Sequence, residues 1–112
     1  MRTDASRLQD ILEALEAIER RARVGRVAFD ADEMLRVWCL HHLTIIGEAA
    51  SGLSPAFRTQ TPSLPWREIV GMRNAIVHGY FDVDWEEVWA VIERDLGPLK
   101  QALADILSRG NV

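Results

Sequence analysis

Hydrophobic residues along this chain recur every three or four positions, which is the spacing of one face of an α-helix. In the first segment they are Leu8, Ile11, Leu12, Leu15 and Ile18. Ser6 and Gln9 have the spacing of a capping box at the start of this segment, and Gly25 follows a cationic last turn. The pattern therefore predicts a first helix that ends before Gly25.

A second helix is predicted from Asp30, which with Glu33 can form its cap, to about Leu53, where Gly52 and Ser54-Pro55 end it. One face carries the apolar stripe Leu35, Cys39, Leu43, Ile46, Ala50 and Leu53. Much of the opposite face is apolar too, at Met34, Val37, Trp38 and Ile45. A helix that is apolar on both sides must be covered on both sides, so we expect a partner subunit over the second face.

Residues 55–64 are expected to form a connecting segment with one short turn. Pro65 stands at a first helical position, so the third helix is predicted to begin there and to end near Gly79-Tyr80. Its apolar stripe contains Trp66, Ile69, Val70, Ile76, Val77 and Tyr80, with Arg73 at the centre.

Asp84 and Glu87 can cap the last helix, which Gly97-Pro98 should kink. The apolar stripe of this helix is Trp85, Val88, Trp89, Ile92, Leu96, Leu99, Leu103 and Ile106. Four principal helices with short connections predict an all-α protein, an antiparallel bundle of four to five helices. At 112 residues, we expect one domain over residues 1–112.

Composition narrows the class of protein. The formal charge of −4 excludes a protein that grips nucleic acid with its whole surface, so any cationic site must be local. The single cysteine, Cys39, excludes an intrachain disulfide and fits a reducing compartment; its apolar neighbours favour a buried, inert thiol. Because no apolar run has the length of a membrane span and no signal-peptide core follows Met1, we expect a cytoplasmic protein with no membrane partner.

The segment Arg73-Asn-Ala-Ile-Val-His78-Gly-Tyr80 is the strongest candidate for chemistry. Arg73 carries a permanent charge and can bind phosphate oxygens in a fork, and the imidazole of His78 can move protons near neutral pH. Although the two positions lie well apart around an ideal helix, Arg73 is long and His78 is near the predicted helix end. Both could therefore reach one phosphate.

Arg73-x-x-x-x-His78-x-Tyr80 resembles the R-x-x-x-x-H-x-Y signature of HEPN domains, specifically the HepT-type toxins that are paired with minimal nucleotidyltransferases. The resemblance extends to the flanks. They are Ile45-Ile-Gly-Glu-Ala-Ala50, the run from Pro65-Trp66 to Arg73-Asn74, Tyr80-x-x-Val83-Asp84, and Val88-Trp89. It implies a HEPN-like bundle and a metal-independent endoribonuclease toxin of a type VII toxin–antitoxin pair. It also implies RNA (tRNA or mRNA) as substrate, a cognate minimal nucleotidyltransferase as antitoxin, and Tyr80 as the residue that the antitoxin adenylylates.

The chemistry supports a homodimer independently. Cleavage of RNA through its 2′-hydroxyl needs a base, an acid and a cation for the charge that develops on phosphorus. One motif supplies one good proton-transfer group, whereas two motifs that meet across a two-fold axis supply two copies of His78 and of Arg73. We assign proton transfer to His78 and phosphate binding to Arg73. Asn74 would orient either group, and no cofactor is required. Assemblies larger than a dimer are left open.

Each assignment has an alternative. Arg73 could form a structural ion pair with Glu48 or Glu68, and His78 could bond a carbonyl at a helix end. Tyr80 could be a core aromatic with its hydroxyl at the rim. The whole motif could also belong to a non-catalytic HEPN protein that binds nucleotide or serves only as the helical partner of a nucleotidyltransferase. A plain helical dimerisation module is a third reading.

Other polar residues receive weaker assignments. His41 and His42 could form a metal site with His78, but no carboxylate or cysteine stands at ligand spacing, so we expect no metal. His41 and Glu48 share a helix face two turns apart and are read as a polar pair. Of the four tryptophans, Trp66, Trp85 and Trp89 lie on core stripes, and Trp38 is an interface candidate.

Overall fold

A computed structural model describes residues 2–77 and 82–110 and confirms the all-α prediction. The helices in these residues are α1 (Asp4–Ala22), α2 (Arg26–Ala31), α3 (Glu33–Ser51), α4 (Pro55–Gln60), α5 (Trp66–Ile76), α6 (Trp85–Arg94) and α7 (Leu96–Arg109). Within the same residues, β-pairing is limited to one isolated antiparallel bridge between Val77 and Val83. None of these helices is long and apolar enough to cross a lipid bilayer.

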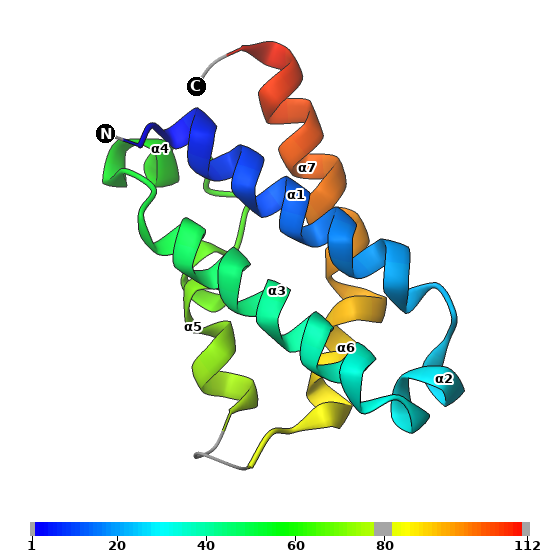
Figure 1. Ribbon diagram of the computed structural model, residues 1–112. Helices are drawn as coiled ribbons and strands as arrows, with labels where there is room; N and C mark the ends of the chain where they lie inside the picture. The colour runs from blue at the N-terminus through cyan, green and yellow to red at the C-terminus, as the bar shows by residue number, and fades with distance from the viewer. Residues whose placement is uncertain (1, 78–81, 111–112) are drawn as a thin grey trace.

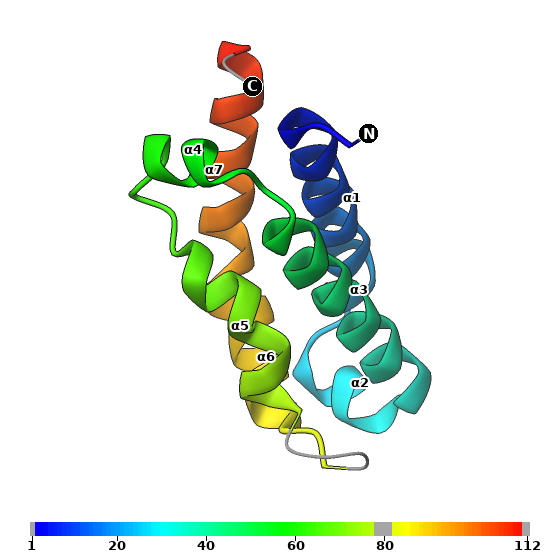
Figure 2. The ribbon, with the colours of Figure 1, turned by 90° about the vertical axis from the view of Figure 1, so that its left-hand side faces the viewer.

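The principal helices form an antiparallel bundle. α1 and α3 run side by side in opposite directions, α5 packs along the other side of α3, and α6 and α7 lie behind them (Figure 1; Figure 2). The start of α1 and the end of α7 lie at one end of the bundle, whereas the end of α5 and the start of α6 lie at the opposite end (Figure 1). The arrangement therefore places the last turn of α5 far from the start of α1 and from the end of α7.

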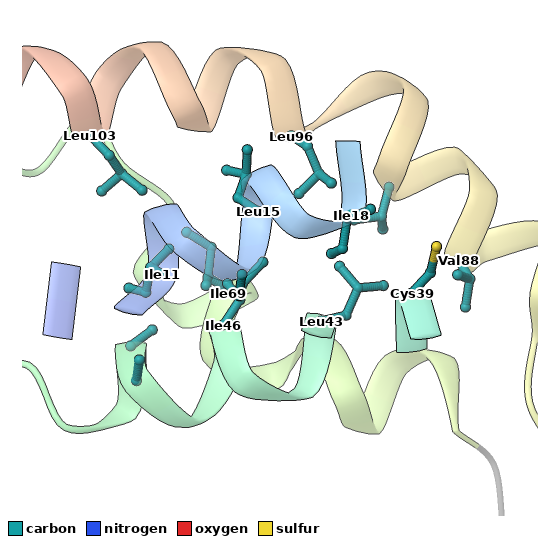
Figure 3. Close-up of a cluster of buried hydrophobic side chains, with 14 of the residues drawn as sticks. Ile11, Leu15, Ile18, Cys39, Leu43, Ile46, Ile69, Val88, Leu96 and Leu103 are labelled. Atoms are coloured by element: carbon teal, nitrogen blue, oxygen red, sulfur yellow. The ribbon is translucent and has the colours of Figure 1, made fainter. Parts of the chain in front are cut away.

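The core consists of the stripes that the sequence predicted. Buried side chains from all seven described helices form one cluster. Figure 3 shows part of it, and its labelled members are Ile11, Leu15, Ile18, Cys39, Leu43, Ile46, Ile69, Val88, Leu96 and Leu103. Burial of this apolar surface is the main favourable contribution to folding. Trp66 is buried as predicted, while Trp85 and Trp89 are half-buried and pack on Phe29, with ring centroids 6.4 and 5.0 Å away.

Two of the predicted helix caps are wrong. α1 begins earlier than expected, because the Thr3 side chain accepts a hydrogen bond from the Ser6 amide at 3.0 Å. α3 is capped by Asp32, whose carboxylate accepts from the Leu35 amide at 3.1 Å. The predicted cap residue Asp30 belongs instead to α2, the short helix that precedes it. The predicted cap at the start of α6 is confirmed, since the Asp84 side chain accepts from the Glu87 amide at 3.1 Å.

The short helices α2 and α4 each bury one aromatic side chain, Phe29 and Phe57 respectively. α4 occupies the place of the expected short turn. Ser54 caps it by accepting from the Phe57 amide at 3.1 Å, and the Ser54 hydroxyl in turn donates to Asp4 at 2.7 Å. This hydrogen bond, with a second from the Ser54 amide, lowers the pKa of the Asp4 carboxyl. The start of α1 is thereby tied to the start of α4.

The predicted last helix divides into α6 and α7 at Asp95, before Gly97-Pro98 rather than at it. A proline ring clashes with the carbonyl four residues earlier, which here belongs to Arg94, the last residue of α6. Pro98 itself lies in the first turn of α7, where its missing amide hydrogen costs nothing. The interruption was therefore expected correctly, but its position was wrong.

Candidate functional site

Arg73 lies on the face of α5 that points into the bundle, yet it is exposed. Its neighbours on that face, Ile69 and Ile76, are 8% and 1% exposed. They stand four residues before and three residues after Arg73, so the three side chains share one stripe. The buried stripe of α5 thus opens to solvent at the position of the cation, and this opening defines the candidate site.

The guanidinium of Arg73 forms no hydrogen bond or ion pair with any other residue in the ranges 2–77 and 82–110. An ion pair with Glu48 or Glu68, the alternative left open by the sequence, is therefore not formed. Asn74 follows Arg73 and is exposed as well. Both side chains are accessible to a ligand.

α5 is shorter than predicted. It ends at Ile76 instead of Gly79-Tyr80, and Val77 adopts an extended conformation and pairs with Val83. The Asp84 amide donates to the Ile76 carbonyl at 2.7 Å, which satisfies one of the free carbonyls at the helix end. Arg73 therefore lies on the last turn of α5. His78 and Tyr80, the other predicted site residues, lie outside the described residues.

The histidines of α3 are not brought to Arg73. His42 is half-buried; one ring nitrogen lies 2.8 Å from the Trp38 carbonyl and its ring stacks on Trp38 at 4.3 Å. His41 is exposed and meets His42 edge-on. Within the described residues, the expected polar pair between His41 and Glu48 is not formed, and no three His, Cys, Asp or Glu side chains are grouped so that they could hold a metal ion.

The outward face of α3 carries exposed apolar side chains, as the sequence predicted. Met34 is 78% exposed, Val37 49% and Trp38 36%. The Trp38 indole is fixed in place, because its N–H donates to the Ala17 carbonyl at 3.2 Å and Arg21 lies over its ring. Ile45 differs from the expectation, since it is half-buried against the chain's own core. We name Met34, Val37 and Trp38 the α3 apolar face.

Cys39 is fully buried in the core, and burial raises the pKa of its thiol to about 11. A thiol with so high a pKa is almost entirely protonated near neutral pH and is a poor nucleophile. The prediction that Cys39 is buried is confirmed, and the raised pKa agrees with an inert thiol.

A groove on the other flank of α5 was not expected from the sequence. It lies between α5 and the α6–α7 junction, has a volume of about 620 Å³, and is lined mainly by apolar side chains that include Met72, Ile76, Leu96 and Leu99. One sign of the groove is visible in the sequence, because Met72 and Ala75 lie off the apolar stripe that is assigned to the core. We name it the α5–α7 groove.

Comparison with known proteins gives a consistent result. Residues 11–106 match the model of a family described as "Ribonuclease HepT-like". A Methanocaldococcus jannaschii protein named "Putative RNase" is 36% identical over 95 residues, which cover 84% of this chain and 87% of the relative. A second "Putative RNase", from Caldanaerobacter subterraneus subsp. tengcongensis, is 34% identical over 97% of this chain and 98% of its own length.

A Thermococcus cleftensis protein named "Probable ribonuclease HepT" is 35% identical over 83% of this chain and 86% of its own length. The comparison with solved structures found no match. The family match spans most of the bundle, from the middle of α1 to the last turns of α7, and includes the candidate site on α5. The chain therefore belongs to the HepT-like family of ribonucleases.

Proposed function

We propose that this protein is a metal-independent endoribonuclease toxin whose active site is shared between two copies of the chain. The observation that carries the proposal is Arg73, an exposed cation on the otherwise buried stripe of α5 that has no partner in the described part of the chain. A permanent charge in such a position is available to a phosphate. In the sequence, His78 follows five residues later and supplies a group that can transfer protons.

In the proposed reaction, the 2′-hydroxyl of one nucleotide attacks the adjacent phosphorus. A base removes the hydroxyl proton, the P–O5′ bond breaks, and an acid protonates the leaving 5′-oxygen. The products are a 2′,3′-cyclic phosphate and a free 5′-hydroxyl, so no metal is needed for the balance of atoms and charge. Arg73 would stabilise the negative charge on the phosphoryl oxygens, and Asn74 would orient the phosphate or the imidazole.

The reaction needs two proton-transfer groups, and each copy of the motif contains one, His78. A two-fold axis close to the end of α5 would bring the second His78 from another copy. The α3 apolar face supports such a dimer, because Met34, Val37 and Trp38 expose a contiguous run of apolar side chains. α3 also packs on α5, the helix that carries Arg73.

We further propose that the partner of this toxin is a minimal nucleotidyltransferase that transfers AMP to Tyr80, as in a type VII toxin–antitoxin pair. The support is the resemblance of the motif and the position of Tyr80, two residues after His78. An attached AMP adds a phosphate charge that competes for Arg73 and a base that obstructs RNA. The modification would therefore silence the nuclease.

Cleavage of a labelled RNA tests the nuclease proposal. We expect the wild-type protein to cleave in the presence of EDTA and to leave 2′,3′-cyclic phosphate ends, which mass spectrometry of the fragments would identify. Arg73→Ala should lower the rate by about a hundredfold or more, because it removes one charge-stabilising donor, and His78→Ala should do the same by removing proton transfer.

Arg67→Ala is the matched control, since Arg67 is exposed on α5 as Arg73 is and points to another side of the helix. Circular dichroism would check that all variants remain folded. Loss of wild-type activity on addition of EDTA, or full activity of folded Arg73→Ala, would exclude the proposed mechanism.

A further inference from the structure

The α5–α7 groove exists because α5 packs closely on α3 and only lightly on α6 and α7. The close approach to α3 is made at Gly47, where an added methyl group would lie 3.5 Å from the Ile69 carbonyl oxygen. On the far flank of α5, Met72 and Ala75 face Val91 and Leu99 across open space. A groove of about 620 Å³ is within the range of sites that bury several apolar side chains of a ligand.

The rim of the groove is acidic. Glu68 from α5, Glu87 from α6 and Asp95 at the α6–α7 junction contribute three carboxylates, and Arg94 contributes one guanidinium. Arg94 is already occupied, because it lies 2.9 Å from Asp95 and 3.6 Å from Glu87. Glu68 forms no ion pair with another described residue. An occupant of this groove should therefore combine apolar side chains with positive charge.

The chain itself presents such a surface where α1 turns into α2. Residues 20–27 contain four arginines and no acid. Val24 and Val27, which are 60% and 85% exposed, lie among these arginines. Arg26 is paired with Asp30 and Glu86, whereas Arg20 and Arg23 are exposed and form no ion pair in the described part of the chain. We name Arg20, Arg23, Val24 and Val27 the α1–α2 corner.

We propose that the α1–α2 corner of one copy docks into the α5–α7 groove of another copy. The two valines would fill the apolar groove, and the two arginines would face the acidic rim, so that shape and charge match together. α2 and α5 stand at opposite edges of the bundle (Figure 1; Figure 2), so the corner lies away from the α5 wall of the groove in its own chain. The contact joins two different surfaces and can repeat from copy to copy, which makes assemblies larger than a dimer.

This contact lies beside the proposed active site but does not use Arg73. Ile69 and Ile76, the neighbours of Arg73 on the α5 stripe, line the groove, whereas Arg73 itself does not. The α3 apolar face is also left free. The docking contact therefore requires neither the nuclease activity nor the two-fold dimer. Variants that disrupt the docking contact can be tested while the active site and the dimer are intact.

Sedimentation velocity of the full chain over a range of concentrations tests the proposal. We expect the wild-type protein to form species larger than a dimer as the concentration rises. Glu68→Arg and Arg23→Glu should each weaken this association by about tenfold or more, because each places like charges in contact. Glu93→Arg and Arg109→Glu make the same charge changes at exposed positions outside both surfaces, and should have no effect.

Mixing the two interface variants gives the sharpest result. In a mixture of the two variants, the unchanged corner of the Glu68→Arg protein can dock into the unchanged groove of the Arg23→Glu protein. In the reverse contact, the introduced glutamate of one variant meets the introduced arginine of the other, and the two charges attract. Association of the mixture should therefore be stronger than that of either variant alone. All of these positions are exposed, so the variants should fold.

The proposal would be overturned by a wild-type protein that never exceeds a dimer, by an assembly that Glu68→Arg leaves intact, or by a mixture of the two variants that does not recover association. Loss of RNA binding in Arg23→Glu with unchanged assembly would also overturn it, and would assign the corner to RNA.

Discussion

Arg73 is exposed, although Ile69 and Ile76, its neighbours on the α5 stripe, are buried. Its charge at the centre of an apolar stripe is visible from the 3.6-residue period, so the residue could be selected as a candidate without a structure. Whether Glu48 or Glu68 neutralises it depends on how α3 and α5 pack, which periodicity does not contain. The packing leaves both carboxylates unpaired with Arg73. An exposed guanidinium also avoids the desolvation cost that a buried one would incur.

Tyr80 carries the prediction at this scale that is easiest to separate from the nuclease chemistry. Incubation with the partner nucleotidyltransferase and ATP should add mass in units of AMP at Tyr80 and abolish RNA cleavage, because the added phosphate and base obstruct the site. Tyr80→Phe lacks the acceptor oxygen, so it should stay active under the same conditions. Peptide mass spectrometry would locate the adduct. An AMP adduct on another residue, or complete silencing of Tyr80→Phe by the nucleotidyltransferase and ATP, would refute Tyr80 as the modified residue. Either result would leave the nuclease proposal unaffected.

At the scale of helices, the long elements could be predicted from sequence and the short ones could not. α1, α3 and the α6–α7 pair each repeat their apolar spacing over several turns, whereas α2 and α4 have only six residues each, too few for a period to show. Caps were misplaced where several candidates follow one another, as at Thr3 and Ser6, because any of them can accept the first free amide. The end of α5 was misjudged because the pairing of Val77 with Val83 is a contact between segments, not a local preference.

The contact between α3 and α5 makes a prediction about Gly47. A methyl group at this position would meet the Ile69 and Val70 carbonyl oxygens at 3.5 and 3.7 Å, which are ordinary contact distances. Gly47→Ala should therefore fit and should raise the free energy of unfolding by up to about 1 kcal/mol, the difference in helix propensity. Gly47→Leu should lower it, because a larger side chain would push α5 away from α3.

Urea denaturation of the wild-type, Gly47→Ala and Gly47→Leu proteins measures these changes in the free energy of unfolding. Gly71→Ala is the matched control, since Gly71 lies in α5 and an added methyl group there would meet nothing within 4 Å. A loss of stability in Gly47→Ala alone would mean that α3 and α5 approach more closely than these distances indicate.

At the scale of the whole molecule, the sequence predicted a bundle with an uncovered apolar face, and the structure confirms both. Periodicity could not predict the α5–α7 groove, because a groove depends on how closely the helices pack, and α5 packs only lightly on α6 and α7. Overall charge was a poor guide to local charge. A chain with a net charge of −4 concentrates arginines in residues 20–27 and carboxylates around the groove.

A shared active site predicts how activity depends on subunit composition. If each site needs both copies of His78, a dimer with one wild-type and one His78→Ala subunit is inactive. Random assembly of equal amounts then leaves about one quarter of the dimers fully wild-type, so activity should fall to about one quarter of that with all subunits wild-type. If each subunit had a complete site of its own, activity would fall only to about one half. Co-refolding of the two chains followed by an RNA cleavage assay distinguishes the two values.

The subunit-mixing experiment requires separate evidence that the protein is a dimer. Sedimentation at low concentration should return about twice the chain mass of 12.7 kDa. Met34→Asp should return the monomer, since it places a charge on the α3 apolar face, and Val27→Asp should leave the dimer intact. A monomer that still cleaves RNA would contradict the shared site.

The start of α1 and the end of α7 lie opposite the last turn of α5, and this arrangement has a consequence for fusion proteins. The start of α1 and the end of α7 leave the bundle at the end away from Arg73 (Figure 1). A tag, a reporter or a second domain joined through either terminus therefore extends away from the candidate site. Proteins fused at both termini would leave the α5 end of the molecule open to a long polymer such as RNA.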